Sequence, residues 1–376
     1  MPSDDDPVVV GAPATLPAPA TLPAPATEAP PPRSFTLVAT GDVLLHQDGT
    51  LTRGAAIAGR ANGTGYDFSG VFAPVAPLIQ GADLAICHLE TPVAGAAGPF
   101  RGYPLFEVQP HIVDALAGAG YDTCSTASNH SLDAGFAGLG RTLDALDARH
   151  IGHTGTFRTP AESRTPRILD VHGVRVGHIS WTYGLNGIPR PDGRQWSVNV
   201  FDPRGPEITG LLADAARTRR AGAEVVVASL HCCEEYVHDP TPAQLALVAA
   251  ALASPDIDLV LGHHSHVVQP FERINDEWAA YGLGNHVAEQ HLGPTEDSMI
   301  ARFTFTEGAD GGFAVTRAEA IPTRIDLSGQ SVRVVSTAAP RGAAARFDAD
   351  TSSYHRVVEI LNRRGAGADG LAITDR

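Results

Sequence analysis

The fold is decided by the stretch Ile257-Asp258-Leu259-Val260-Leu261-Gly262-His263-His264-Ser265-His266. Its first half is an apolar run of the length of a buried strand, and a glycine ends it. Three imidazoles then follow within four residues. Packing alone does not explain such a concentration of histidine, whereas metal binding at the end of a strand does.

Four further apolar runs of strand length are followed by side chains of the same kind. The runs are 35–40, 82–87, 121–126 and 225–230, and after them come Gly41-Asp42, His88-Leu89-Glu90, Asn129-His130 and His231. Leucines at helical spacing lie between the runs, so the pattern predicts an α/β fold with parallel strands. Because the C-terminal ends of parallel strands meet at one crevice, we expect these side chains to converge.

Together the strand-end side chains match a site for two divalent metal ions. A carboxylate can bridge two ions, while imidazole and amide groups fill the outer positions and a water between the ions becomes the nucleophile. Imidazole and carboxylate donors without thiolate suit Mn, Fe or Zn. Taken singly, each motif also has a structural reading, namely a turn at Asp42, a helix cap at Asn129 and a buried core histidine at His231.

The order of these motifs resembles the CapA, or PGA_cap, family of metallophosphoesterase-like proteins. The matching stretches are Thr40–His46, Asp83–Pro92, Ala127–Asp133, Ser229–His231, Gly262–Pro270 and Tyr281–Asn285. The resemblance implies a calcineurin-like metallophosphoesterase fold of class α/β, with two packed mixed β-sheets flanked by helices in an αββα sandwich. It implies a metal-ligand set of Asp42, Glu90, Asn129, His231, His264 and His266.

The resemblance also assigns roles beside the metal ligands. His130 takes the position of a general acid. His263 lies where the family tolerates several residues, so we leave it out of the ligands. Arg101 and Tyr103 resemble a family segment near the site, and we expect them and Asn285 to bind substrate.

Three departures from the family pattern lie close to these motifs. His88 stands where relatives usually have Asn, Cys232-Cys233 replaces a Trp-Gly pair, and His286 replaces an aromatic residue. His88 is a candidate extra ligand or proton carrier, and His286 a candidate proton carrier. The departures suggest a site adapted to another substrate, although neutral drift would look the same.

The four cysteines, Cys87, Cys124, Cys232 and Cys233, all lie beside motifs. Three pairings are open to them, and the sequence does not choose among them. Cys87 and Cys124 both end strand-like runs, so a bridge fits an oxidising compartment. We nevertheless favour four buried thiols acting as small apolar side chains.

Composition excludes several function classes. The formal net charge is −15, so nucleic-acid binding is not expected. All 27 basic residues are arginine, which excludes Schiff-base and P-loop lysine chemistry. No apolar run reaches the length of about 18 residues that a membrane span needs. The acidic start, Met1–Asp6, does not resemble a signal peptide, and we leave the compartment open between the cell envelope and the cytoplasm.

Three regions follow from the composition along the chain. Residues 1–33 are rich in Pro and Ala and predict a disordered tail or linker. Residues 34–327 form the predicted metallophosphoesterase domain, with a hairpin of Met299–Thr306 and Phe313–Ile321 near its end. Residues 328–376 form a C-terminal extension with a terminal helix, and we assign no structure to 328–345.

Three functions remain open at this point. The first is a metal-dependent hydrolase acting on an anionic or peptide-like substrate, with poly-γ-glutamate as the association of the family. The second is an accessory protein without turnover, partnered with capsule synthesis or export proteins. The third uses the same metals for a peptide epimerase or a phosphoesterase.

Overall fold

The computed structural model describes residues 11, 31–202, 208–290, 292, 294–335 and 344–375, with side chains from 348 onward in the last range. Most of the tail predicted for residues 1–33 lies outside these residues. The described residues from Pro32 onward form one compact unit. Within the described part of the chain, no helix is both long enough and apolar enough to span a bilayer.

The larger of two sheets has nine strands in the described residues. Their order is β14-β13-β12-β1-β2-β3-β4, with β11 beside β1 and β15 beside β13. Strands β1 to β4 run parallel, whereas β12, β13 and β14 form an antiparallel extension. The bounds are β1 Ser34–Val43, β2 Leu84–Leu89, β3 Thr123–Ser125, β4 Gly152–Thr154, β11 Asn285–Val287, β12 Asp297–Glu307, β13 Phe313–Asp326, β14 Ser331–Val334 and β15 Ala372–Ile373.

The smaller sheet has six strands in the order β5-β6-β7-β8-β10-β9. Strands β6, β7, β8 and β10 are parallel, and the two edge strands are antiparallel to their neighbours. Both sheets therefore mix the two kinds of pairing. The bounds are β5 Arg167–Val171, β6 Val174–Thr182, β7 Val225–His231, β8 Leu259–His263, β9 Phe271–Ile274 and β10 Glu277–Ala280.

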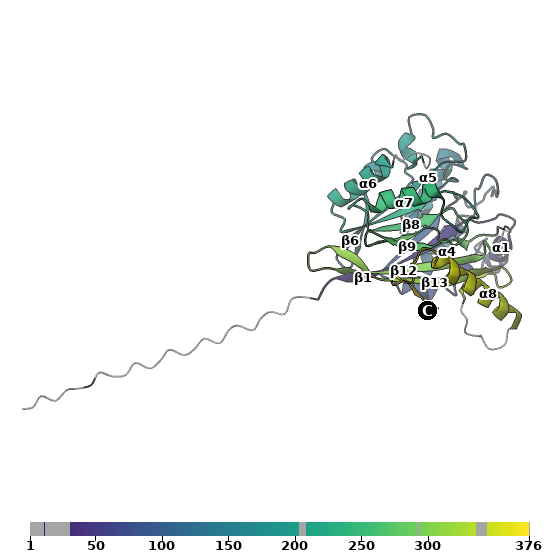
Figure 1. Cartoon of the computed structure of the whole chain (residues 1–376). Helices are drawn as coiled ribbons and strands as arrows, with labels where there is room; N and C mark the ends of the chain where they lie inside the picture. Colours follow the sequence, from purple (N-terminus) through teal and green to yellow (C-terminus); the bar gives the residue numbers. More distant parts are fainter. Residues whose placement is uncertain are drawn as a thin grey trace, which may run out of the picture. The chain divides into compact units, whose positions relative to one another are not determined.

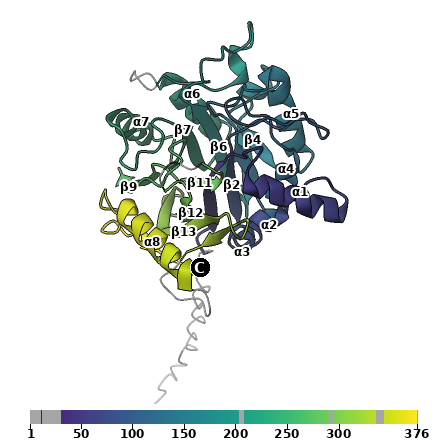
Figure 2. The ribbon, with the colours of Figure 1, turned by 90° about the vertical axis from the view of Figure 1, so that its right-hand side faces the viewer.

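Helices α1 to α7 cover the outer faces of the two sheets, as Figures 1 and 2 show, whereas α8 packs on the side of the larger sheet that meets the smaller one. Helices α6 and α7 contact the smaller sheet, α5 contacts β4, and α8 contacts β12 and β13 of the larger sheet. The bounds are α1 Thr50–Asn62, α2 Ser69–Phe72, α3 Ala76–Gln80, α4 His111–Ala119, α5 Gly135–Asp147, α6 Thr209–Arg220, α7 Pro242–Leu252 and α8 Ala344–Leu361.

The core is divided into layers by the alternation of side chains along each strand. In β7, Val225 and Val227 pack between the two sheets, whereas Val226 and Ala228 pack against α6 and α7. A third cluster lies between the larger sheet and helices α1 to α5. Strands buried on both faces read as continuous apolar runs, which is the pattern seen in the sequence. The predicted architecture, two mixed sheets flanked by helices, is confirmed.

The C-terminal region adds to the larger sheet. β14 and β15 both pair with β13, and Val357, Ile360 and Leu361 of α8 are buried in the cluster between the sheets. The predicted hairpin is confirmed as β12 and β13. The stretch 328–345, to which no structure was assigned, contains β14, and residues 336–343 lie outside the described range.

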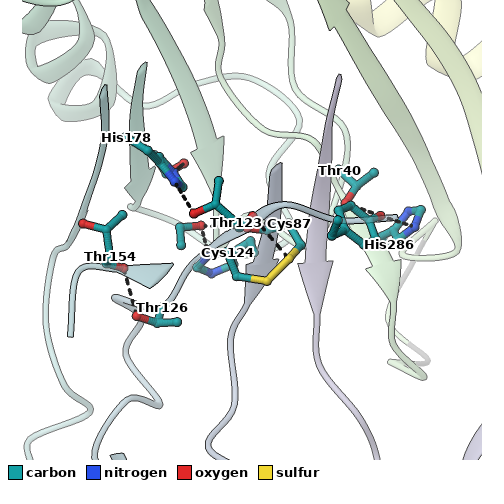
Figure 3. Close-up of a disulfide and its surroundings, with 12 residues drawn as sticks. Thr40, Cys87, Thr123, Cys124, Thr126, Thr154, His178 and His286 are labelled. Atoms are coloured by element: carbon teal, nitrogen blue, oxygen red, sulfur yellow. Dashed lines mark hydrogen bonds between the residues drawn. A yellow bond between two sulfur atoms is a disulfide. The ribbon is translucent and has the colours of Figure 1, made fainter. Parts of the chain in front are cut away.

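The cysteines are paired as Cys87–Cys124 and Cys232–Cys233. The preference for four thiols was therefore wrong. Cys87 and Cys124 are register partners on β2 and β3, which brings their side chains together in the buried interior. Figure 3 shows this bridge beside Thr123, with His178 and His286 on opposite sides of it.

Candidate metal centre

The ends of strands from both sheets meet at one place. Asp42 and His88 are register partners at the ends of β1 and β2, and His231 and His263 are register partners at the ends of β7 and β8. All four side chains are buried. The centre is therefore built at the seam between the sheets, as expected for the C-terminal ends of parallel strands.

Two glycines allow the close approach of backbone that this convergence requires. A Cβ at Gly41 would lie 1.8 Å from the carbonyl oxygen of Gly284, and a Cβ at Gly262 would lie 1.8 Å from that of Tyr281. Each glycine directly precedes a donor residue, Asp42 or His263. Any side chain at either position would push the donor strands apart.

The chain leaves strand geometry immediately after β8. His264 and His266 have φ angles of 83° and 54°, in the left-handed region that residues other than glycine seldom adopt. Such backbone conformations persist where the surrounding structure holds them, and they concentrate at functional sites. Here they turn successive imidazoles toward the same centre.

Donor atoms gather in four overlapping groups, within each of which they lie no more than 4.8 Å apart. Every member is buried except Glu235, which is exposed. The groups are Asp42, His88 and His263; Glu90, His231 and His264; Asp42, Glu90 and His266; and Glu235, His264 and His266.

Several of these donor atoms are buried without a hydrogen-bond partner. They are Asp42 Oδ1, both carboxylate oxygens of Glu90, both ring nitrogens of His263 and Nδ1 of His264. Orphaned polar atoms are rare in protein interiors because each costs about 1–3 kcal/mol. Their concentration at one point fits bound cations, each of which would satisfy the atoms that face it.

The charges of the two buried carboxylates lead to the same conclusion. Burial raises the pKa of Glu90 to about 7, with a further contribution from the charge of Asp42. Burial also opposes ionisation of Asp42, but contacts with His263 and His266 outweigh it and lower the pKa of Asp42 below its ordinary value. In the described residues neither carboxylate pairs with an arginine. A metal cation would provide the missing positive charge.

The imidazoles are largely neutral, as metal ligands must be. Burial lowers the pKa of His264 to about 3 and holds the pKa values of His88 and His231 well below their ordinary value. His266 differs, since Glu90 and Asp42 outweigh the effect of burial and raise its pKa to about 9. Its Nδ1 lies 3.1 Å from Asp42 Oδ2 and its Nε2 lies 3.7 Å from Glu90 Oε1. A proton on His266 thus takes the position between carboxylates that a metal ion would occupy.

A chain of hydrogen bonds orients three of the side chains. Ser125 Oγ lies 2.8 Å from His88 Nδ1, and His88 Nε2 lies 2.9 Å from His231 Nδ1. His231 Nε2 lies 2.9 Å from Asn129 Oδ1. The chain fixes the ring planes of both histidines.

His130 lies at the opening of the centre rather than among the buried donors. Its Nδ1 is 2.7 Å from Asp133 Oδ2, which also accepts a hydrogen bond of 2.8 Å from the backbone N–H of Phe106. Burial lowers the pKa of His130, but the hydrogen bond to Asp133 and the charge of Glu90 outweigh it, so the net pKa is raised. The imidazole is therefore held as a proton donor.

The centre opens into a cavity of about 610 Å3 that His130, Asn129, His264 and Glu235 help to line. A second cavity, of about 900 Å3, shares Tyr103, Pro104 and Leu105 with it. A third, of about 720 Å3, shares Tyr183, Cys233 and Glu234 with it. The three cavities are neighbours through these shared residues, with the cavity at the metal centre in the middle, and together we call them the groove.

Comparison with known proteins places this geometry in a family. The model of the bacterial capsule synthesis protein PGA_cap matches residues 36–290, a range that includes every donor named above. The chain belongs to the PGA_cap family. Curated members include "Capsule biosynthesis protein CapA" of Bacillus anthracis, which is 26% identical over 276 residues. Another is "Probable polyglutamine synthesis accessory protein" of Mycobacterium tuberculosis, which is 25% identical over 245 residues.

The relatives are longer than the matched region. The match to the Bacillus anthracis protein covers 71% of this chain and 63% of that protein, and the match to the mycobacterial protein covers 61% and 63%. Among solved structures, the calcineurin-like phosphoesterase YfkN from Bacillus subtilis is 15% identical, with a TM-score of 0.43 over 88% of this chain and 99% of that chain.

The structure brings the six ligands implied by the PGA_cap resemblance close together. Glu90, His231 and His264 form one donor group and Asp42, Glu90 and His266 another, while Asn129 reaches His231. Two donors were missed in the sequence. His263 was left out of the ligands but forms a group with Asp42 and His88. Glu235 was not considered, although an acidic pair three and four residues after His231 was a signal available in the sequence.

The remaining candidate residues of this PGA_cap member occupy different places. Arg101 and Tyr103 line the largest cavity, where Arg101 pairs with Glu107 and Tyr103 is 82% exposed. Asn285 is fully buried and its Oδ1 lies 3.0 Å from His266 Nδ1, so it contacts a donor rather than the groove. His286 belongs to none of the four donor groups found in the described residues, and its Nε2 lies 3.0 Å from the buried hydroxyl of Tyr121.

Proposed function

We propose that this PGA_cap member is a metal-dependent hydrolase that cleaves an anionic or peptide-like polymer. The observation that carries the proposal is the cluster of unpartnered, buried Asp, Glu and His donors opening into the middle of a groove. Residues 42, 90, 129, 231, 264 and 266 would hold two divalent ions. The oxygen and imidazole donors suit Mn, Fe or Zn.

The chemistry of the ions fits hydrolysis. Two ions held there would make a water acidic enough to attack near neutral pH and would stabilise negative charge on the substrate. The buried imidazole of His264 is neutral and its Nδ1 has no hydrogen-bond partner, so it retains a lone pair for binding. His231 is also neutral, and a metal ion would replace one of its contacts with His88 and Asn129. The Ser125–His88–His231–Asn129 chain keeps His231 and Asn129 in fixed orientations.

The side chains at the opening supply the proton that hydrolysis requires. Asp133 raises the pKa of His130, which favours its protonated form, and His130 lies beside Asn129, so it can donate a proton to the leaving group. Phe106 packs edge-on against its ring, with centroids 4.8 Å apart. These contacts fix one ring orientation, as proton transfer in a single geometry requires.

The shape of the groove favours a chain-like substrate. Cavities flank the metal centre on two sides, and arginines line both of them, Arg53 and Arg101 on one side and Arg190 on the other. Arg53 and Arg190 donate to backbone carbonyls, which leaves their positive charge available to an anionic group. The capsule proteins among the relatives make poly-γ-glutamate the first polymer to test.

The test uses the purified full chain loaded with Mn2+, Zn2+ or Fe2+. It is incubated with poly-γ-glutamate, with α-linked polyglutamate and with a chromogenic phosphate ester, and new amino groups and polymer length are measured. We expect new amino groups and shorter chains from one of the polymers. Glu90→Gln and His264→Ala should abolish this cleavage, and His178→Ala should not, because His178 is buried outside the donor groups.

A second function is favoured by the mycobacterial relative, whose name describes an accessory protein. A metal-loaded chain that binds the polymer but releases no amino groups would support an accessory role and contradict hydrolysis. Deuterium incorporation at Cα in the absence of cleavage would instead indicate an epimerase. Release of the chromogen alone would indicate a phosphoesterase.

A further inference from the structure

We propose that His88 and His263 are metal ligands, which together with Asp42 hold one of the two ions in a site that differs from the ligand set implied for the family. This inference rests on the metal centre of the proposed function. It assigns a role to two histidines that the six implied ligands leave unused.

His263 carries the strongest part of the argument. Its side chain is 1% exposed, and neither ring nitrogen has a hydrogen-bond partner. A buried core histidine normally satisfies both nitrogens, because each unpartnered polar atom is costly. His178 is such a residue, since its Nε2 lies 3.0 Å from Ser229 Oγ and its Nδ1 lies 3.4 Å from Thr123 Oγ1. His263 therefore has the burial of a core residue and the free nitrogens of a ligand.

The distances fit a shared coordination sphere. His263 Nδ1 lies 3.4 Å from Asp42 Oδ1, which has no hydrogen-bond partner either. Two ligand atoms that each lie about 2.1 Å from one metal, at angles of about 90–110°, are separated by about 3.0–3.4 Å. The spacing of these two atoms is thus that of neighbouring ligands.

His88 completes the group from the facing sheet. Its ring stacks on that of His263 with centroids 4.2 Å apart, and it is the register partner of Asp42. Ser125 holds its Nδ1 at 2.8 Å, so its Nε2 points toward the centre, where it lies 2.9 Å from His231 Nδ1. A metal ion bound at this Nε2 would replace that contact between the two rings. A metal-binding histidine usually has its second nitrogen fixed, as Ser125 fixes Nδ1 here.

The two ions would then have distinct ligand sets. Asp42, His88 and His263 form one group and Glu90, His231 and His264 another, with no residue in common. His266 and Glu90 lie beside Asp42 and can contribute to both. Loss of His263 should therefore remove one ion and leave the other, whereas loss of His264 should remove the second.

The experiment measures bound metal rather than activity. The full chain and its variants are loaded with Zn2+, freed of excess metal and analysed by mass spectrometry for metal per chain. We expect about two ions for the wild type and for the buried control His178→Ala, and about one for His263→Ala and for His264→Ala. The double variant His263→Ala/His264→Ala should bind none, and Zn2+ affinity at the first site should fall at least about 100-fold in His263→Ala.

X-ray absorption on the Zn2+-loaded wild type provides a readout that needs no variant. If His88 and His263 are ligands, the average number of imidazoles per zinc should exceed the value that His231, His264 and His266 alone supply. Two ions retained by His263→Ala with unchanged affinity would overturn the inference while leaving the proposed function intact. A wild type that binds no Zn2+, Mn2+ or Fe2+ would overturn both.

Discussion

Glu277 is a half-buried carboxylate, one oxygen of which is buried without a hydrogen-bond partner. Burial and the neighbouring charge of Asp258 raise its pKa to about 7. The folded state therefore binds a proton more tightly than the unfolded state, so stability should fall as pH rises from about 4.5 through about 7.

Glu277→Gln should remove this pH dependence. Because the side chain is partly exposed, we discount the full shift and expect a gain of about 1 kcal/mol at pH 8 and almost none at pH 4. Urea unfolding at the two pH values measures the difference. Glu359→Gln on the exposed face of α8 is the control, and an equal gain in that variant would show a general charge effect.

Residue by residue, the sequence predicted the donors that follow strands and missed those that depend on local backbone. His263 and His264 are adjacent, and in a regular strand adjacent side chains point to opposite faces. β8 ends at His263, and the positive φ at His264 turns that side chain back to the same centre. A sequence pattern contains no signal for that turn, and His263 was set aside because it lies where the family tolerates several residues.

At the scale of elements, substitutions in α8 test whether the C-terminal region is part of the core. Leu361 is fully buried in the cluster between the sheets, whereas His355 on the same helix is exposed. Leu361→Ala should cost about 2–5 kcal/mol of unfolding free energy, because it leaves a cavity. His355→Ala should stay within about 0.5 kcal/mol. Chemical denaturation measures both, and equal effects would show that α8 does not pack as described.

The bridge between β2 and β3 gives a second prediction for an element. The disulfide joins residues 37 apart, and closing a loop of that length in the unfolded chain stabilises the fold by about 2–4 kcal/mol. The double variant Cys87→Ala/Cys124→Ala should lose about that much stability. Thermal unfolding with and without a reductant measures the effect. The remaining response of the double variant to the reductant reports on Cys232–Cys233 alone.

The strands themselves were predictable because both faces of each strand are buried, so its sequence is apolar throughout. The runs that became β1, β2, β7 and β8 are apolar on both faces, since each packs between a second sheet and a helix layer. β14 lacks this signal: it lies at an edge of the larger sheet and has two partly exposed residues in four. Its pairing with β13 depends on contacts that a local pattern does not contain.

For the whole molecule, the position of the metal centre at the seam of the two sheets links metal binding to stability. Asp42, His88 and Glu90 come from the larger sheet, and His231, His263 and His264 from the smaller one. Metal bound only by the folded state stabilises it by about 2.7 kcal/mol at a concentration 100 times the dissociation constant. Chelation should therefore lower the melting temperature, and Mn2+ or Zn2+ should raise it in proportion to the logarithm of metal concentration.

The net charge of −15 requires a control for unspecific binding of cations. His264→Ala keeps that charge at neutral pH but removes a donor, so its melting temperature should rise less steeply with added metal. His178→Ala should follow the slope of the wild type, because it removes a buried imidazole outside the donor groups. Equal slopes in all three proteins would mean that the cations only screen surface charge and that no metal joins the two sheets.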